Sequence, residues 1–67
     1  TRIEAHRLEA LIIEDLTRYP RSSVGEIRGR IGEELPAPRI KRALDKLVAE
    51  GRVTHEGENR WRRYRLT

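Results

Sequence analysis

The sequence predicts a small α+β domain, mainly α with one small β-hairpin, in the order helix, helix, helix, strand, strand. Apolar residues recur at steps of three and four in residues 5–19, 24–31 and 38–48, as on one face of an amphipathic helix. After Gly51 the period changes to two, which is typical of strands. The 67 residues are enough for one domain, and they contain no repeat or linker. We therefore expect residues 1–67 to fold as a single domain.

The first two helices have recognisable ends. Pro20 ends the first helix, because the residue before a proline, here Tyr19, is pushed out of the α-helical region. Ser23 and Glu26 have the spacing of a capping box, in which each side chain accepts a hydrogen bond from the backbone N–H of the other. Gly32 stands where a glycine commonly ends a helix.

The third helix is predicted to begin near Pro38, since a proline in the first helical turn loses no hydrogen bond. Its apolar face runs from Ile40 to Val48, and Gly51 ends it. The opposite face is charged and carries Arg39, Lys41, Arg42, Asp45 and Lys46.

Residues 52–56 and 59–66 are predicted strands on either side of Gly57-Glu58. A glycine at the first loop position suits a two-residue type II′ turn. This turn would place Thr54 opposite Trp61 and would leave a short, tight hairpin.

The same register would place Arg52 opposite Arg63, a pair of like charges that a phosphate could relieve. A bulge or a slip of one residue would reverse the direction of Trp61. The residues predicted to face the core are Val53, Tyr64 and Leu66.

Composition excludes several classes of protein. The absence of cysteine rules out disulfide scaffolds, zinc fingers and thiol chemistry. His6 and His55 lie far apart without ligand spacing, and no acid–base or nucleophile pair is visible, so we expect no metal, no cofactor and no catalytic activity in this domain. No apolar run approaches about 18 residues and no signal peptide is visible, so we expect no membrane partner. The chain begins at Thr1 and lacks methionine, so we expect it to be part of a longer protein, which could itself be an enzyme.

Three stretches resemble winged helix-turn-helix DNA-binding domains of the kind found in bacterial regulators. They are residues 23–27 (SVGEI), 42–53 (RALDKLVAEGRV) and 63–66 (RYRL). In that family the middle stretch is the recognition helix leading to a glycine and the first wing strand, and the last stretch is the return strand. The resemblance covers almost all of the chain.

The resemblance implies a recognition helix at about 37–50, a wing at 52–66 and room for a short extra strand near 21–23. One departure is Pro36-Ala37-Pro38, where many relatives carry a Ser or Thr cap and further polar residues. This difference removes hydrogen-bonding groups from the part of the helix nearest the bases in relatives. It leaves binding to the DNA backbone unaffected.

The distribution of charge is an independent argument for a nucleic-acid partner. Residues 1–38 hold six arginines and seven acids, a net charge of −1. Residues 39–67 hold nine lysines or arginines and four acids, a net charge of +5. The basic excess therefore lies in the predicted recognition helix and wing, and we expect the domain to bind double-stranded DNA.

In the third helix, Arg39, Arg42 and Lys46 recur at steps of three and four and so form one outward stripe. Arg42 is the candidate for bidentate contact with a guanine edge. Arg39, Lys46 and Lys41 would lie nearer the phosphates. The alternative is a solvated face in which Asp45 pairs with Lys41 or Lys46.

In the wing, arginines concentrate positive charge, which favours backbone contacts and a steep salt dependence. Trp61 has two interpretations, a contact with the sugar–phosphate backbone or a base, and ordinary cross-strand packing over Thr54. Arg60 and Arg62 are placed to enter a narrow minor groove. The predicted DNA-binding residues of the wing are Arg52, Arg60, Trp61, Arg62, Arg63 and Arg65.

Several alternatives stay open at the level of the sequence. A winged helix can instead serve as a protein-interaction module, with Trp61 and the apolar stretch 35–38 as the contact. Structured RNA is an alternative nucleic-acid partner. The domain could belong to a transcriptional regulator or a DNA-processing protein, in the cytoplasm with the nucleoid or in a eukaryotic nucleus. Ile3 and Ile13 lie off the apolar stripe of the first helix and could form a homodimer contact or cover a neighbouring domain.

Overall fold

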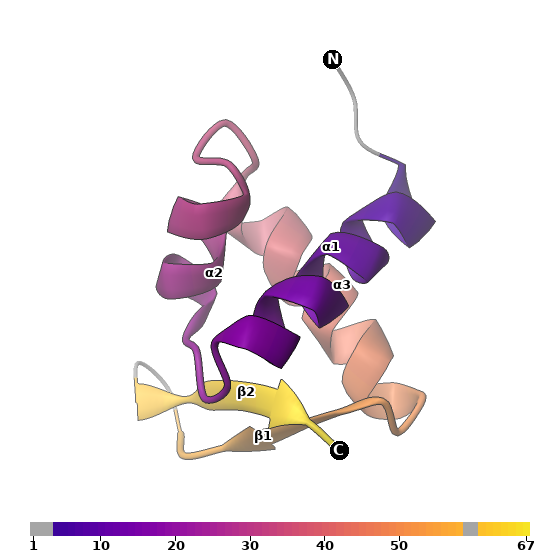
Figure 1. Cartoon of the computed structure of the whole chain (residues 1–67), viewed down its shortest axis with the longest axis vertical. Helices are drawn as coiled ribbons and strands as arrows, with labels where there is room; N and C mark the ends of the chain where they lie inside the picture. Colours follow the sequence, from indigo (N-terminus) through magenta and orange to yellow (C-terminus); the bar gives the residue numbers. More distant parts are fainter. Residues whose placement is uncertain (1–3, 59–60) are drawn as a thin grey trace.

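The computed structural model describes residues 4–58 and 61–67, and it shows three helices packed above a two-stranded hairpin (Figure 1). This is the predicted order and the predicted α+β class. The elements are α1 (Ala5–Arg18), α2 (Val24–Ile31), α3 (Ala37–Ala49), β1 (Val53–Glu56) and β2 (Arg63–Leu66).

The helix ends follow the local signals in the sequence. The capping box at α2 is confirmed, because Ser23 Oγ accepts from the Glu26 N–H at 3.2 Å and Glu26 Oε1 accepts from the Ser23 N–H at 2.9 Å. Gly32 directly follows the last residue of α2. Beyond α3, Gly51 has a φ of +75°, the left-handed conformation that favours glycine.

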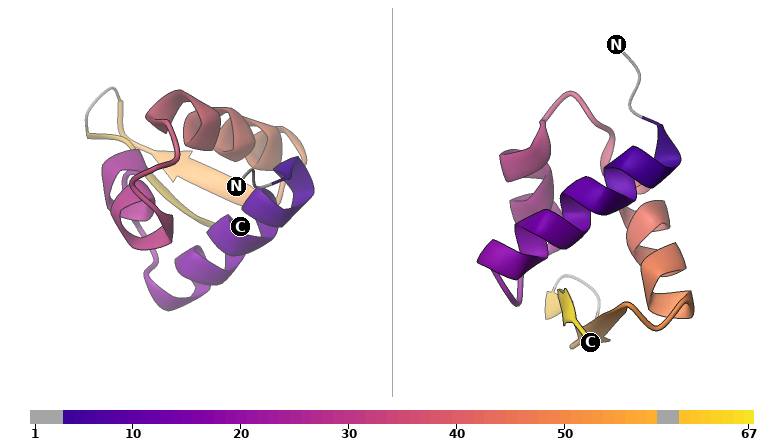
Figure 2. Two further views of the ribbon diagram at one scale, coloured as in Figure 1. Left: turned by 90° about the horizontal axis from the view of Figure 1, so that it is seen from above. Right: turned by 45° about the vertical axis from the view of Figure 1, so that its right-hand side comes forward.

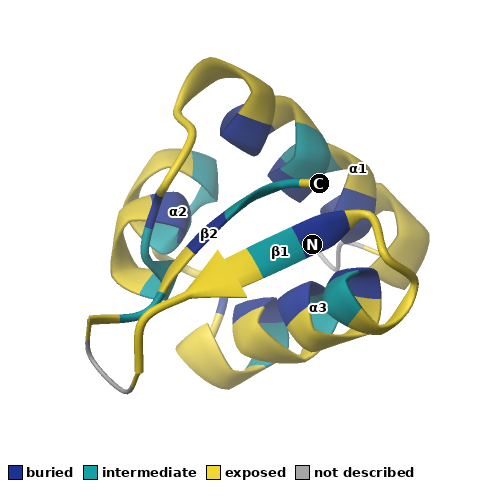
Figure 3. Cartoon of the chain, turned by 90° about the horizontal axis from the view of Figure 1, so that it is seen from below, coloured by how far each residue is buried: buried dark blue, intermediate teal, exposed yellow. Residues whose placement is uncertain are grey.

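Every element contributes to one hydrophobic core. Each helix packs on the other two, and the hairpin covers the open end of the bundle (Figure 2). Buried residues line the inner faces of the helices and hairpin, whereas the outer face of α3 and the end of β1 are exposed (Figure 3). The core consists of Leu8, Ile12, Leu16, Ile27, Leu35, Ile40, Leu44, Leu47, Val53 and Tyr64.

Two details of the core differ from the sequence-based expectation, and one adds to it. Ile13 packs partly against the core, although it was expected to lie off the apolar stripe, and Ile3 is outside the described residues. Tyr19 is 50% exposed, because it lies past the end of α1 and its ring packs under the Arg30 guanidinium, 4.4 Å from the ring centroid. The Tyr64 side chain is core as expected, but its hydroxyl is buried and has no hydrogen-bond partner among the described residues.

The hairpin register is different from the predicted one. Val53 pairs with Leu66 and Glu56 pairs with Arg63, so residues 57–62 form a longer connection in place of a two-residue turn. Gly57 has a φ of +79°, and a Cβ there would lie 2.7 Å from the Trp61 carbonyl oxygen. This close backbone approach requires glycine.

The corrected register changes two expected pairings. Arg63 lies opposite Glu56, so the predicted like-charge pair with Arg52 is not formed. Thr54 lies opposite Arg65, so Trp61 is not its cross-strand neighbour. The prediction that Val53, Tyr64 and Leu66 share the core-facing side is nevertheless confirmed.

The extra strand expected near residues 21–23 is present as a single bridge. Ser22 donates its N–H to the Tyr64 carbonyl at 3.1 Å and accepts from the Tyr64 N–H at 2.8 Å. This bridge joins the α1–α2 connection to the hairpin. No helix in the described part of the chain is long and apolar enough to cross a membrane.

Candidate nucleic-acid interface

The exposed face of α3 is centred on Arg42. A groove of about 200 Å³ toward α1 is lined partly by Arg39, Arg42 and Lys46, so the predicted stripe is formed. A second, shallow groove of about 490 Å³ toward α2 is lined partly by Lys41, Arg42 and Asp45. Arg42 borders both grooves, and it therefore lies at the crest of the face, opposite the buried Leu44 side.

Two of the four predicted cations on α3 are engaged in ion pairs. Lys46 Nζ lies 3.0 Å from Glu9 Oε2 on α1, and this hydrogen bond raises the pKa of Lys46. Lys41 Nζ lies 3.3 Å from Asp45 Oδ2 one turn along the helix, one of the two pairings expected for Asp45. Arg39 and Arg42 have no ion pair with any residue in the described parts of the chain, so their charges are available to a ligand.

The strand arginines of the wing are also paired. Arg63 Nη1 donates to Glu26 Oε1 at 2.6 Å and to the Arg21 carbonyl at 3.2 Å. The pKa of Glu26 is lowered, first by the Ser23 N–H of the capping box and then by the charge of Arg63. Glu26 therefore has two roles. Its carboxylate caps α2, and it links α2 to β2 by accepting a hydrogen bond from Arg63.

A second carboxylate holds the outer face of the hairpin. Arg65 Nε donates to Glu56 Oε1 at 2.6 Å, and Arg21 Nε lies 4.0 Å from the same oxygen. The hydrogen bond from Arg65, followed by the charge of Arg21, lowers the pKa of Glu56. These contacts neutralise part of the charge of the wing.

The remaining predicted wing residues lie before β1 and in the loop. Arg52 is exposed, and Arg62 is half-buried with its Nε buried; neither is ion-paired with a residue that the structure describes. Trp61 is 72% exposed in the loop that precedes β2. Arg60 lies outside the described residues, so its predicted contact has no structural counterpart.

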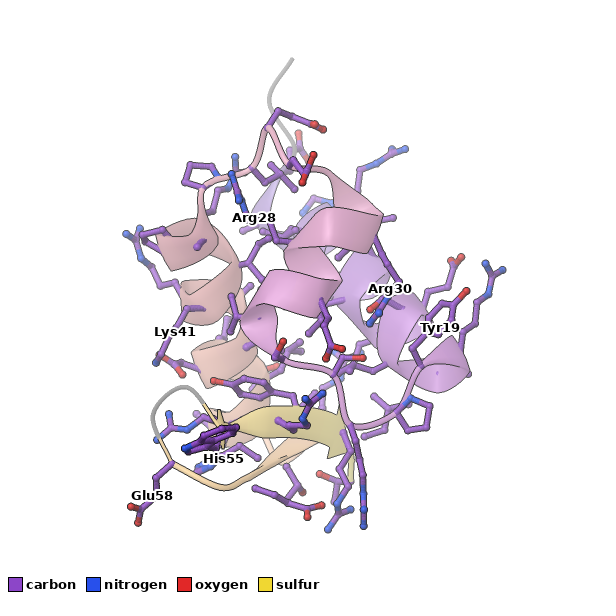
Figure 4. All side chains as sticks on the ribbon, turned by 90° about the vertical axis from the view of Figure 1, so that its left-hand side faces the viewer. Tyr19, Arg28, Arg30, Lys41, His55 and Glu58 are labelled. Atoms are coloured by element: carbon purple, nitrogen blue, oxygen red, sulfur yellow. The ribbon has the colours of Figure 1, made fainter. Side chains whose placement is uncertain are left out.

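Helix α3 and the hairpin present one continuous side of the molecule. Lys41 on α3 lies on the same side as His55 and Glu58 of the hairpin, with α3 above and the hairpin loop below (Figure 4). Tyr19 and Arg30 lie on the other side of this view. The hairpin end that carries His55 and Glu58 thus lies on the same side of the molecule as Lys41 of α3.

One polar cluster was missed by the sequence reading. Arg30 donates to both carboxylate oxygens of Asp15, at 2.8 and 2.9 Å, and also to Ser22 Oγ. Asp15 is buried, and the cluster ties α1 to α2 on the side of the molecule opposite Lys41. No local signal reveals it, because its members are brought together only by the packing of the helices.

Three helices followed by an antiparallel hairpin, with α3 and the hairpin on one side, form a winged helix-turn-helix domain. The fold is similar to the apo-Zalpha domain of zebrafish PKZ, with a TM-score of 0.82 and 27% identity over 92% of this chain and 94% of that chain. It is also similar to the DIP2311 protein from Corynebacterium diphtheriae, with a TM-score of 0.81 and 25% identity over 96% of this chain. The match spans 11% of the DIP2311 chain.

No protein-family model matches the chain, and no curated protein matches it in sequence. The structural likeness supports a nucleic-acid-binding domain at the level of the fold.

Proposed function

We propose that this domain binds double-stranded DNA, with α3 in the major groove and the wing on the backbone or in the minor groove. The observation that carries the proposal is the exposed Arg42 at the crest of α3, which has no ion pair with any residue that the structure describes. A helix about 10–12 Å across fits the B-DNA major groove, which is about 12 Å wide.

Arg42 is the residue proposed to read a base. Its guanidinium can donate two parallel hydrogen bonds to O6 and N7 of guanine, a geometry that lysine does not reproduce. Because no carboxylate in the described parts of the chain pairs with it, no internal ion pair has to break first.

Arg39, Arg52 and Arg62 are proposed to contact phosphates. Lys41, Lys46, Arg63 and Arg65 stay among the proposed contacts, but at each a phosphate would compete with a carboxylate, at Asp45, Glu9, Glu26 and Glu56 respectively. We therefore expect the unpaired arginines to contribute more to DNA affinity than the paired cations.

The direct test compares Arg42→Ala with Arg18→Ala in binding to a duplex of mixed sequence. Arg18 is an exposed arginine on α1, so its replacement makes the same change in net charge away from the proposed surface. We expect Arg42→Ala to weaken binding about tenfold or more, in line with about 1–3 kcal/mol for a bidentate base contact. Equal effects of the two substitutions would show that only net charge matters and would contradict the proposed surface.

The biological setting that follows is a transcriptional regulator or a DNA-processing protein, acting with the nucleoid or in a nucleus. A regulator requires preference for particular sequences, whereas a processing protein can function with backbone contacts alone. A binding selection from random duplexes separates the two, since enrichment of one motif supports the regulator.

A protein-interaction module is the second candidate, and the exposed Trp61 is the observation that favours it. The apolar surface available for this contact is smaller than the stretch 35–38, because Leu35 is part of the core. Pro36, Ala37 and Pro38 are exposed. If this candidate is correct, a complex with an acidic protein survives DNase treatment and is lost in Trp61→Ala.

A further inference from the structure

The groove between α2 and α3 has an apolar floor beside the exposed Arg42. Val24, Ala37 and Pro38 form the apolar part, and Lys41, Arg42 and Asp45 form the rim. Val24 is half-buried, whereas Ala37 and Pro38 are exposed. Apolar surface therefore continues directly into the surface proposed to contact DNA.

The N-cap and the first two residues of α3 have no polar side chain to offer a base. The N-cap is Pro36, which makes no side-chain hydrogen bond to the helix, and Ala37 and Pro38 follow. Donors and acceptors begin only with Arg39 and Lys41. A base edge that meets this turn is thus in contact with hydrocarbon.

The major groove displays one apolar group that would match such a surface, the C5-methyl of thymine. The other features of the base edges are donors and acceptors, which lose water without gaining a partner when they meet hydrocarbon. Cytosine lacks the methyl group and presents an amino donor in place of the thymine O4.

We propose that Ala37 and Pro38 contact thymine methyl groups and so give the domain a preference for thymine beside the base that Arg42 reads. This inference rests on the proposed binding of duplex DNA. The charges on the rim favour DNA as the occupant of this groove. Arg42 attracts a polyanion, and the negative charge of Asp45 is neutralised by Lys41.

The helical rise sets the distance between the two contacts. Ala37 and Pro38 precede Arg42 by five and four residues, or about 6–7.5 Å along the helix axis at about 1.5 Å per residue. Successive base pairs are about 3.4 Å apart. The preferred thymine is therefore about two base pairs from the guanine.

The test uses two duplexes of about 21 base pairs, or two turns of DNA, that differ only in methyl groups. One is a repeat of d(GTT)·d(AAC), which places thymine one and two steps from every guanine, and the other carries deoxyuridine in place of every thymine. The wild-type domain should bind the thymine duplex about fourfold more tightly for each methyl contacted, as expected for burial of one methyl-sized group.

Two variants identify the residues responsible. Ala37→Ser combined with Pro38→Ser should reduce the thymine-to-uracil affinity ratio to about one, whereas Arg42→Ala should weaken binding to both duplexes and leave the ratio unchanged. The wild-type ratio is informative by itself if the double variant fails to fold.

The outcomes separate this inference from the proposed function. A wild-type ratio of one with steep salt dependence overturns the methyl contact and leaves DNA binding intact; a protein occupant of the groove would give this result. A ratio that survives in the folded double variant also overturns it, because the methyl groups would then act through DNA shape. Binding to neither duplex overturns the proposed function as well.

Discussion

At the scale of single residues, arginines of similar sequence context have different roles in this domain. Arg42 and Arg63 both belong to basic stretches, but Arg42 has no ion pair within the described residues, whereas Arg63 is bonded to Glu26 at 2.6 Å. The stripe on α3 was predictable, because helical periodicity alone places its members. The pairing of Arg63 was not, because Glu26 is 37 residues away in the sequence.

Glu26→Gln should separate the two roles of Glu26. Glutamine retains the acceptor needed for the capping box but removes the charge that pairs with Arg63. We expect Arg63 to become available to a phosphate, so that the slope of log K against log salt for duplex binding becomes steeper by up to about 0.9. Glu26→Ala, which also removes the cap, is the matched variant and should lower helix stability in addition. An unchanged slope in Glu26→Gln would show that Arg63 does not reach DNA.

The lowered pKa values of Glu26 and Glu56 predict loss of stability in acid. A carboxyl whose pKa is lowered by folding stabilises the folded state above its unfolded pKa, and this contribution is lost as the pH falls through the folded pKa. The melting temperature should therefore fall as the pH drops below the ordinary carboxylate range. The double variant Glu26→Gln, Glu56→Gln should show a smaller fall over the same range, and an identical pH profile would contradict the assignment.

Among the ion pairs that the structure describes, the pair between Asp15 and Arg30 should contribute most to the free energy of unfolding. Asp15→Asn leaves Arg30 without its carboxylate at a site where the Asp15 side chain is only 9% exposed. We expect a loss of about 2 kcal/mol in the free energy of unfolding, between the effects of exposed and fully buried pairs. Glu14→Gln, in an exposed pair with Arg18, is the control and should cost less than about 0.5 kcal/mol in urea unfolding. Similar losses in both variants would contradict this ranking.

At the scale of the elements, the helices were predictable and the hairpin connection was not. Helix ends are set by local residues such as Pro20, Ser23 and Gly51, which act through their own backbone geometry. The hairpin register depends on a longer loop whose residues 59–62 have no alternating apolar pattern.

The predicted faces of the strands were nevertheless correct. The true partner of each β1 residue lies four positions further along the chain than predicted, so Val53 pairs with Leu66 in place of Arg62. Side chains alternate with a period of two, and a shift by an even number of residues keeps every side chain on its face. The apolar pattern therefore determined the faces and left the register open.

Two glycines provide a paired test of the helix geometry. Gly29 lies within α2, and a Cβ there would meet no atom within 4 Å, so Gly29→Ala should stabilise the domain by about 0.5–1 kcal/mol. Gly51 also has open space but a φ of +75°, so Gly51→Ala should destabilise it by about 1 kcal/mol. Denaturant unfolding of both variants measures the effects, and opposite signs are expected. A stabilising Gly51→Ala would contradict the left-handed backbone at this position.

At the scale of the whole molecule, the division of charge along the sequence overstates the charge available to a ligand. Residues 39–67 carry a net charge of +5, but Glu9 and Glu26 from the first half of the chain pair with Lys46 and Arg63 from the second. The packing of the helices and hairpin thus places two acidic side chains of the first half against basic side chains of the second. The charge that remains available to a ligand lies on arginines, such as Arg42, that have no ion pair among the described residues.

Competition between duplexes tests the expected preference for DNA over RNA. The major groove of A-form RNA is deep and narrow, so α3 cannot enter it, and only contacts with the phosphates and the shallow minor groove remain. We expect duplex RNA of the same sequence to compete at least about tenfold less well than duplex DNA in a fluorescence-anisotropy assay. Equal competition would place the helix outside the major groove.

The salt dependence of duplex DNA binding tests the central claim most directly, namely that unpaired arginines on α3 and the wing neutralise phosphates. The structure describes four such residues among those proposed to bind DNA, Arg39, Arg42, Arg52 and Arg62. With Arg42 on a base or a phosphate, three or four neutralised phosphates predict a slope of log K against log salt between about −2.5 and −4. A slope near zero, with binding that persists at high salt, would contradict the account.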